Sequence, residues 1–185
     1  MTSITPGDLL IAPPAMADPR FKNSVLLITQ HSSQGTQALC INKPSGHTVN
    51  EIVQAIDLEL PQDVNLFWGG PVGLNTVWMI HDVDWAGDNT MRISEHWAMT
   101  SSMNMFHKIT AGDRPKWFRV VMGLSSWAPG QLAMEMEGDG PFNIESSWLT
   151  AHAPTPQELL SQPPRDLWRN ACDISGTQAV SQWLA

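Results

Sequence analysis

The stretch SVLLITQHSSQGTQALCIN, residues 24–42, determines how the first part of the chain folds. Two apolar runs rich in strand-forming residues, 24–30 and 36–42, flank the polar segment 31–35. Runs of this kind are typical of a β-hairpin when a short segment containing glycine separates them, because glycine tolerates the backbone angles of a tight turn. We therefore predict two antiparallel strands joined by residues 31–35.

Polar residues at both ends of this hairpin raise the question of whether it carries a site. Asp18 and Arg20 precede the first strand, His31 ends it, and Asn42 ends the second strand. The pairing brings Asp18 and Asn42 together, but about 23 Å of extended strand separates Ser24 from His31. We therefore expect Asp18 to be structural, accepting hydrogen bonds from nearby backbone amides or from Asn42. A strongly coiled strand would bring Asp18 and His31 closer and leave a shared catalytic site open.

Strand and helix patterns alternate along the rest of the chain. Capping-box sequences that begin at Thr48 and Thr155 predict two helices, and an apolar stripe in the first includes Ile56. Further helices are expected at 101–112, at 128–138 with Pro129 near the first helical position, and at 164–176. Strands are expected at 64–72, 75–83, 91–93, 116–127 and 142–151. Because the first strands form a hairpin rather than βαβ units, the pattern predicts an α+β fold with a mixed, largely antiparallel sheet.

Composition narrows the class of protein. The chain has 185 residues, of which 42% are apolar and 15% charged, as expected for one globular domain spanning 1–185 that does not cross a membrane. Ten basic residues stand against 18 acidic ones, and the net charge of −8 disfavours direct nucleic-acid binding. Cys40 and Cys172 lie in apolar runs, and the N-terminal segment has no basic leader. These features predict free thiols and a cytoplasmic location.

Sequence motifs for catalysis and cofactors are absent. The chain contains no P-loop, GxGxxG, HExxH, CxxC or GxSxG pattern, so we predict no catalytic residue, no cofactor and no metal site. Only His81 and Asp82 resemble a pair of metal ligands. The segment Gly69-Gly70-Pro71 follows a strand and is either an anion cradle or a tight turn. We favour the turn, because no helix pattern begins after it.

Nine tryptophans could form a stacking surface for single-stranded nucleic acid or pack in the core. Trp68, Trp78, Trp117 and Trp148 lie in strand-like apolar runs, so core packing is favoured for them. Trp85, Trp97 and Trp183 have more polar neighbours, and we expect these three to be partly exposed.

Several of these motifs occur together in one known family. They are GDLLIAPPAMADPRFKNSVLLITQH (7–31), INKP (41–44), WGGPV (68–72), WAPGQLAMEME (127–137) and SSWLTA (146–151). In this order and over nearly the whole chain, the sequence resembles the YqgE/AlgH family. It departs from the family at Ala38, where a small glycine is usual, and in a longer 137–148 link. The resemblance implies one AlgH-like domain with a small barrel-like or bifurcated β-core surrounded by helices, in the cytoplasm.

The resemblance also bears on function. Some family members carry a transcriptional-regulator label, but the acidic charge disfavours direct DNA binding. The shared motif residues are mostly glycine, proline and aromatic, whereas a catalytic family is expected to share more ionisable residues. We therefore favour a non-enzymatic binding or regulatory module whose protein or small-molecule partner is unknown, with the oligomeric state left open. The alternative is a small-molecule enzyme or ligand sensor with a polar cleft near Asp18 and His31. The candidate binding residues are Asp18, Arg20, His31, Asn42, Gly69, Gly70, Pro71 and Gln131.

Overall fold

The predicted hairpin is present in the computed structural model, which describes residues 4–60, 64–138 and 147–184. Its strands are β2 (Val25–Ser32) and β3 (Gly35–Cys40), which pair antiparallel up to Ser32 and Gly35. Gly35 has a φ of 127°, and a Cβ placed on it would lie 2.4 Å from the carbonyl oxygen of Trp127. Glycine is therefore required here both by the backbone angle and by the close approach of the neighbouring strand.

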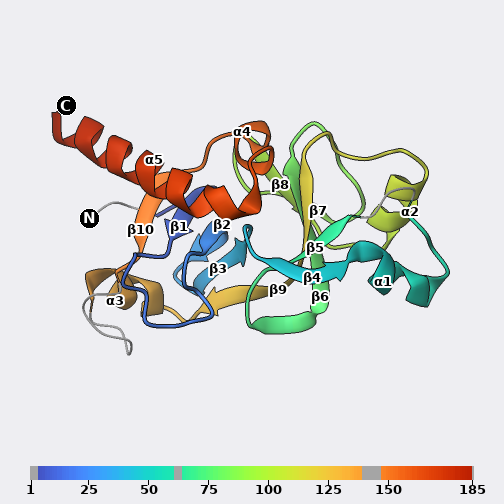
Figure 1. Cartoon of the computed structure of the whole chain (residues 1–185), viewed down its shortest axis with the longest axis horizontal. Coiled ribbons are helices and arrows are strands. Elements are labelled where there is room, and N and C mark those ends of the chain that lie inside the picture. The colour runs from blue at the N-terminus through green and yellow to red at the C-terminus, as the bar shows by residue number, and fades with distance from the viewer. Residues whose placement is uncertain (1–3, 61–63, 139–146, 185) are drawn as a thin grey trace.

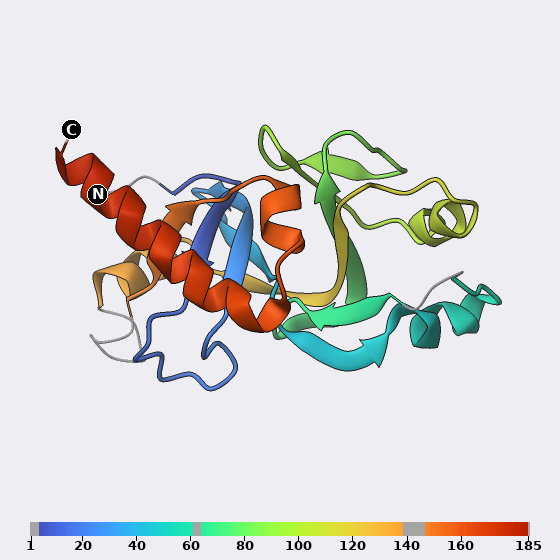
Figure 2. The same ribbon diagram turned by 45° about the horizontal axis from the view of Figure 1, so that its top comes forward.

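The described residues contain ten strands that form one curled sheet (Figures 1 and 2). The main path runs β10-β1-β2-β3-β9-β6-β8-β7, and β4 and β5 branch from it. The remaining strands are β1 (Asp8–Ile11), β4 (Pro44–Thr48), β5 (Asn65–Trp68), β6 (Val72–Asp82), β7 (Thr90–Arg92), β8 (Trp97–Thr100), β9 (Phe118–Trp127) and β10 (Leu149–His152). Every pairing is antiparallel except that of β5 with β9. The predicted mixed, largely antiparallel α+β fold is confirmed.

The sheet divides at β9, as the bifurcated β-core expected from the resemblance requires. One edge of β9 pairs with β6. The other edge pairs first with β5, through Val120 to Met122, and then with β3, through Ser125 to Trp127. Strands β3 and β5 therefore share one edge of β9 in succession, and the two branches separate beside Gly123.

The segment Gly69-Gly70-Pro71 carries the chain from one edge of β9 to the other. Strand β5 ends at Trp68 and β6 begins at Val72, so the crossing takes three residues. A Cβ on Gly69 would lie 2.2 Å from the carbonyl oxygen of Gly123, and one on Gly70 would lie 2.1 Å from the carbonyl carbon of Leu124. Only glycine lets the two backbones approach this closely, so the fold itself requires this pair of glycines.

Helices lie at the two ends and along one face of the sheet. They are α1 (Val49–Val53), followed by the 3₁₀ turn η1 (Gln54–Ile56), then α2 (Asn104–Thr110), α3 (Gln131–Glu137), α4 (Pro156–Leu160) and α5 (Pro164–Leu184). Figures 1 and 2 show α3 and α5 at one end and α1 and α2 at the other. Helix α5 packs on β10, where the Ser175 hydroxyl donates to the Thr150 carbonyl at 2.8 Å.

Three groups of buried apolar side chains hold these layers together. The first lies between the sheet and α5 and includes Leu27 and Leu167. The second joins α1 and α2 to the sheet through residues such as Phe106. The third lies between the other face of the hairpin and α3, and includes Cys40 and Leu132. Alternate residues of the hairpin strands thus face two different groups, which gives the hairpin an apolar environment on both sides.

The structure corrects several predicted boundaries. The helix that follows Thr48 leaves regular α geometry after Val53, and Ile56 is 39% exposed, so this residue is not part of the buried stripe. Helix α5 continues past Gly176 to Leu184, because one glycine lowers helix stability only modestly. Pro129 precedes the Gly130 cap of α3 rather than occupying the first helical turn.

Two tryptophans and three strands differ from the sequence-based predictions. Trp85 is 8% exposed and Trp97 is 1% exposed. Both are buried because their indole N–H groups have acceptors, Asp113 Oδ1 and the Pro154 carbonyl, each at 2.8 Å. The side chain of Trp183 lies outside the described residues, as do residues 142–146 of the expected last strand. Strands β1, β4 and β8 were not predicted. Strand β1 is a run of only four residues, and β4 and β8 lack a strand pattern of their own.

Candidate functional site

Asp18 lies in the loop between β1 and β2 and is 8% exposed. Its carboxylate accepts hydrogen bonds from the Arg20 backbone amide at 2.9 Å and from Arg20 Nη2 at 2.7 Å. These bonds hold the pKa of Asp18 below its usual range. The bond from a nearby backbone amide is the arrangement expected for a structural aspartate, but Asn42 is not among its partners.

Asn42 instead fastens the start of β2 to the end of β3. Its Oδ1 accepts from the Val25 amide at 2.8 Å, and its Nδ2 donates to the Asn23 carbonyl at 2.8 Å. The next residue, Lys43, donates from Nζ to the Arg20 carbonyl. The Asp18 loop and the Asn42 end of the hairpin are therefore brought together.

His31 lies at the opposite end of the hairpin. It pairs with Thr36, close to the Ser32–Gly35 turn, and its Nδ1 is 2.7 Å from the Thr36 hydroxyl. The imidazole is exposed, and the strand between it and the Asp18 loop is extended. The Asp18 loop and His31 therefore lie at opposite ends of the hairpin.

An aromatic cluster covers the sheet beside the Asp18 loop. The Phe21 ring centroid lies 5.6 Å from that of Trp68 and 5.6 Å from that of Trp148. Two cations lie over these rings: the Arg20 guanidinium is 5.9 Å from the Phe21 centroid, and Lys43 Nζ is 5.8 Å from the Trp68 centroid. Phe21 and Trp68 are half-buried, whereas the Arg20 side chain is 57% exposed. We call these five residues the aromatic platform.

Gln131 contributes to the same surface through Glu135. The Glu135 carboxylate accepts from the indoles of Trp127 and Trp148, at 2.9 and 3.0 Å, and from Gln131 Nε2 at 3.0 Å. Gln131 therefore holds in place the carboxylate that fixes α3 to two tryptophans. Glu135 was not among the predicted site residues, although its four-residue spacing from Gln131 places both on one helix face.

The three residues Gly69, Gly70 and Pro71 follow Trp68 of the platform directly. The Gly69 amide donates to the Met122 carbonyl at 2.8 Å, and the Gly69 carbonyl accepts from the Cys40 amide at 2.8 Å. The Gly69 amide is therefore engaged within the sheet. The turn that we favour over an anion cradle stays a prediction for this segment.

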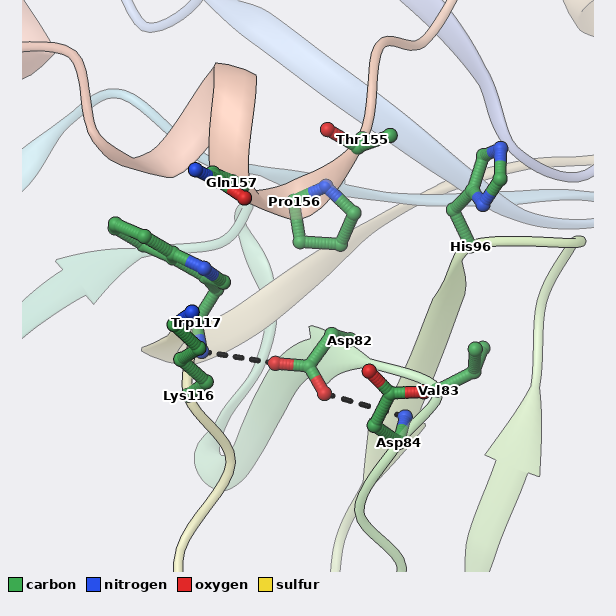
Figure 3. A pocket seen from close by; sticks show the side chains of 9 residues that line it. All are labelled: Asp82, Val83, Asp84, His96, Lys116, Trp117, Thr155, Pro156 and Gln157. Carbon is green, nitrogen blue, oxygen red and sulfur yellow. Dashed lines mark hydrogen bonds between the residues drawn. The ribbon is translucent and has the colours of Figure 1, made fainter.

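A pocket of about 250 Å³ lies on another part of the molecule, where four segments distant in sequence meet (Figure 3). Its lining residues are Asp82, Val83, Asp84, His96, Lys116, Trp117, Thr155, Pro156 and Gln157. The Asp82 carboxylate accepts from the backbone amides of Trp117, at 2.8 Å, and Asp84, at 3.2 Å. This one side chain joins the loop after β6 to the segment before β9. No sequence motif indicated the pocket, because the fold alone brings these segments together.

His81, beside the pocket, is fully buried in a chain of hydrogen bonds. Its Nδ1 is 2.6 Å from the Asp82 carbonyl, and its Nε2 is 2.9 Å from the Thr100 hydroxyl. The Thr100 hydroxyl is 2.6 Å from that of Thr90, which accepts from the Gly87 amide at 2.9 Å. Burial lowers the pKa of His81. The chain is satisfied when His81 is neutral, with Nδ1 donating and Nε2 accepting.

The described part of the chain also bears on metal binding and on membrane crossing. No three His, Cys, Asp or Glu side chains there are grouped so that they could hold a metal ion. Among the same residues, no helix combines the length and the apolar character needed to cross a membrane.

Comparisons with known proteins assign the family. The AlgH-like family model matches residues 9–179, which is most of the chain. The chain belongs to the AlgH-like family. Its relatives include a UPF0301 protein of Methylococcus capsulatus, 30% identical over 90% of this chain and 87% of the relative. A UPF0301 protein of Sphingopyxis alaskensis is 31% identical over 94% and 90% of the two chains.

Two solved structures of similar fold support the same assignment. The solution structure of the AlgH protein from Pseudomonas aeruginosa has a TM-score of 0.75 and 30% identity, covering 95% of this chain and 93% of that one. A crystal structure of a protein from Corynebacterium diphtheriae has a TM-score of 0.69 and 25% identity, covering 91% and 85% of the two chains. The names of these proteins state no reaction and no ligand.

Proposed function

We propose that this AlgH-like protein is a non-enzymatic cytoplasmic binding or regulatory module that contacts a protein partner through the aromatic platform. The observation that carries the proposal is the half-buried ring cluster of Phe21 and Trp68 beside the cations of Arg20 and Lys43. Arginine and large aromatic side chains are enriched at the centres of protein interfaces, where they supply much of the binding energy. A partner segment with apolar and carboxylate side chains fits this surface.

The ionisable candidates support binding rather than catalysis. The Asp18 carboxylate is bonded to Arg20, and Asn42 is bonded to the backbone at both ends of its amide. His31 is distant from both along the extended strand. A general acid or base must lie within hydrogen-bond reach of a reacting group, and these residues are engaged in holding the loop and hairpin.

The pocket in Figure 3 favours a second candidate, a ligand sensor. In that case a small molecule bound in the pocket would regulate the module. This candidate corresponds to the ligand sensor that we gave as an alternative from the sequence. Its location beside Asp82 and Lys116 differs from the cleft near Asp18 and His31 that the sequence suggested. A transcriptional role in this setting would be indirect, because the net charge of −8 opposes direct DNA binding.

Comparative capture from extract of the native cells tests the proposal. The immobilised protein is compared with two charge-matched variants, Arg20→Ala/Lys43→Ala on the platform and Arg165→Ala/Arg169→Ala on α5. We expect one protein to be retained in stoichiometric amount by the wild type and the α5 variant and to be lost from the platform variant. Urea unfolding of all three confirms that each is folded. Equal retention by the two variants, or turnover of a metabolite that depends on Asp18, would contradict the proposal.

A further inference from the structure

The pocket beside β6 is a built feature rather than a gap between loops. Asp82, which is 9% exposed, fixes its floor, because its carboxylate binds the amides of Trp117 and Asp84. The Asp82 amide also donates to the Trp117 carbonyl at 3.1 Å. At the opposite wall, Thr155 and Glu158 close a capping box at the start of α4. Backbone and side-chain bonds therefore hold both walls in place.

The charges left available in the pocket have opposite signs. The Asp82 carboxylate is satisfied by two amides, and the Thr155 hydroxyl is engaged with Glu158. Lys116 and Asp84 are exposed, and no ion pair joins them within the described residues. Figure 3 shows them on the two sides of Asp82. The pocket thus presents one cation, Lys116, and one anion, Asp84, from the two segments that Asp82 joins.

The remaining lining sets the size and character of a ligand. The volume of about 250 Å³ lies below the usual range for drug-sized ligands, which is roughly 300–1,000 Å³, and this favours a small ligand. Trp117 and Pro156 offer apolar surface, while Gln157 and His96 offer further polar groups at the rim. Two carboxylates among the lining residues disfavour a ligand that carries only negative charge.

We infer that this pocket binds a small zwitterion of the amino-acid class, with the ligand carboxylate facing Lys116 and its ammonium group facing Asp84. The ligand side chain lies against Trp117 and Pro156. Each charged end of the ligand then meets a group of opposite sign, and the apolar part is removed from water. This inference concerns a different surface from the aromatic platform and does not depend on it.

NMR titration of the full chain tests the inference. The Trp117 indole N–H resonance is identified as the one missing from the spectrum of Trp117→Phe. Each of the common amino acids is added singly, with acetate and methylamine as probes that carry only one of the two charges. We expect at least one amino acid to shift this resonance saturably, and acetate and methylamine to bind about tenfold more weakly or worse, since each makes only one charged contact.

Matched variants decide whether the pocket is responsible. Lys116→Ala and Asp84→Asn should each weaken binding of that amino acid about tenfold or more. The controls Lys22→Ala and Asp173→Asn, exposed residues outside the pocket, should leave it unchanged. The inference is overturned if no amino acid shifts the resonance, if acetate binds as tightly as the amino acid, or if the two pocket variants bind like the controls.

Discussion

Arg119 illustrates how individual charged residues are accommodated within this sheet. It is 6% exposed, and its guanidinium donates to the carbonyls of Ile41 and Leu160 and lies 4.3 Å from the Phe67 ring centroid. Burial lowers the pKa of Arg119 to about 10, so it stays charged at neutral pH. Carbonyl groups and an aromatic face take the place of a carboxylate partner. A charged residue here joins β9 to the hairpin and to α4.

The structural role of Asp18 can be measured as its contribution to the free energy of unfolding. Asp18→Ala removes the acceptor of the Arg20 amide and guanidinium in a buried position. We expect the free energy of unfolding to fall by about 1–3 kcal/mol, the cost of unsatisfied polar groups. The measurement is urea unfolding, with the exposed residue change Asp173→Ala as the control. An unchanged midpoint for Asp18→Ala, together with loss of an interaction or an activity, would make Asp18 a functional residue.

The buried His81 predicts a pH dependence of stability. Burial lowers its pKa below the ordinary value of 6.5, so the unfolded chain takes up a proton at a higher pH than the folded one. Its contribution is therefore complete above pH 6.5 and is lost as the pH falls from there through the lowered pKa. Urea unfolding across this range should show a smaller loss for His81→Gln than for the wild type. The exposed-residue variant His107→Gln should follow the wild type, and equal slopes for all three proteins would contradict the role of His81.

At the scale of elements, the crossing of β9 by Gly69 and Gly70 gives the sharpest prediction. Gly69→Ala would place a Cβ 2.2 Å from the Gly123 carbonyl oxygen, whereas a Cβ on Gly176 in α5 meets nothing within 4 Å. We expect Gly69→Ala to lower the free energy of unfolding by about 3 kcal/mol or more, since neither backbone can move aside.

Gly176→Ala is the matched control for this crossing. It should raise the free energy of unfolding by about 0.5–1 kcal/mol, because alanine favours a helix interior. Thermal or urea unfolding measures both variants. A Gly69→Ala protein as stable as the wild type would show that the backbones do not cross as described.

Elements with a strong local pattern were predictable, and elements defined by distant neighbours were not. The β2–β3 hairpin and the capping box at Thr155 were predicted because turn glycine and cap chemistry act within a few residues. Strand β8, in contrast, exists because it lies between β6 and β7, and its sequence from Trp97 to Thr100 has no alternation of its own. Propensity is a weak guide where tertiary pairing determines the strand.

The same division holds for the candidate site. Asp18 and Asn42 were expected to lie at one end of the hairpin, because register follows from strand length. The bonds of Glu135 to two tryptophans and the convergence of four segments at the pocket depend on the whole fold. Contacts between side chains that are far apart in the sequence leave no regular spacing by which they could be predicted.

At the scale of the whole molecule, the branch at β9 separates the two regions for which we propose a function. The aromatic platform lies on the face of the hairpin that packs with α3, whereas the pocket lies between the ends of β6, β8 and β9 and the start of α4. One sheet thus carries both the surface that we propose for a protein partner and the cavity that we propose for a small molecule. Strand β9 runs between the two: Trp117, which lines the pocket, precedes it, and Trp127 at its end contacts Trp148 of the platform.

Site-specific photocrosslinking in the native cells tests the central claim, that the aromatic platform is a partner-binding surface. A benzophenone amino acid replaces Lys22, which is exposed and adjacent to Phe21, or Arg165, which is exposed on α5. The account predicts one discrete protein adduct from position 22 that Arg20→Ala/Lys43→Ala abolishes, and no such adduct from position 165. The same adducts from both positions, or none from position 22, would contradict it.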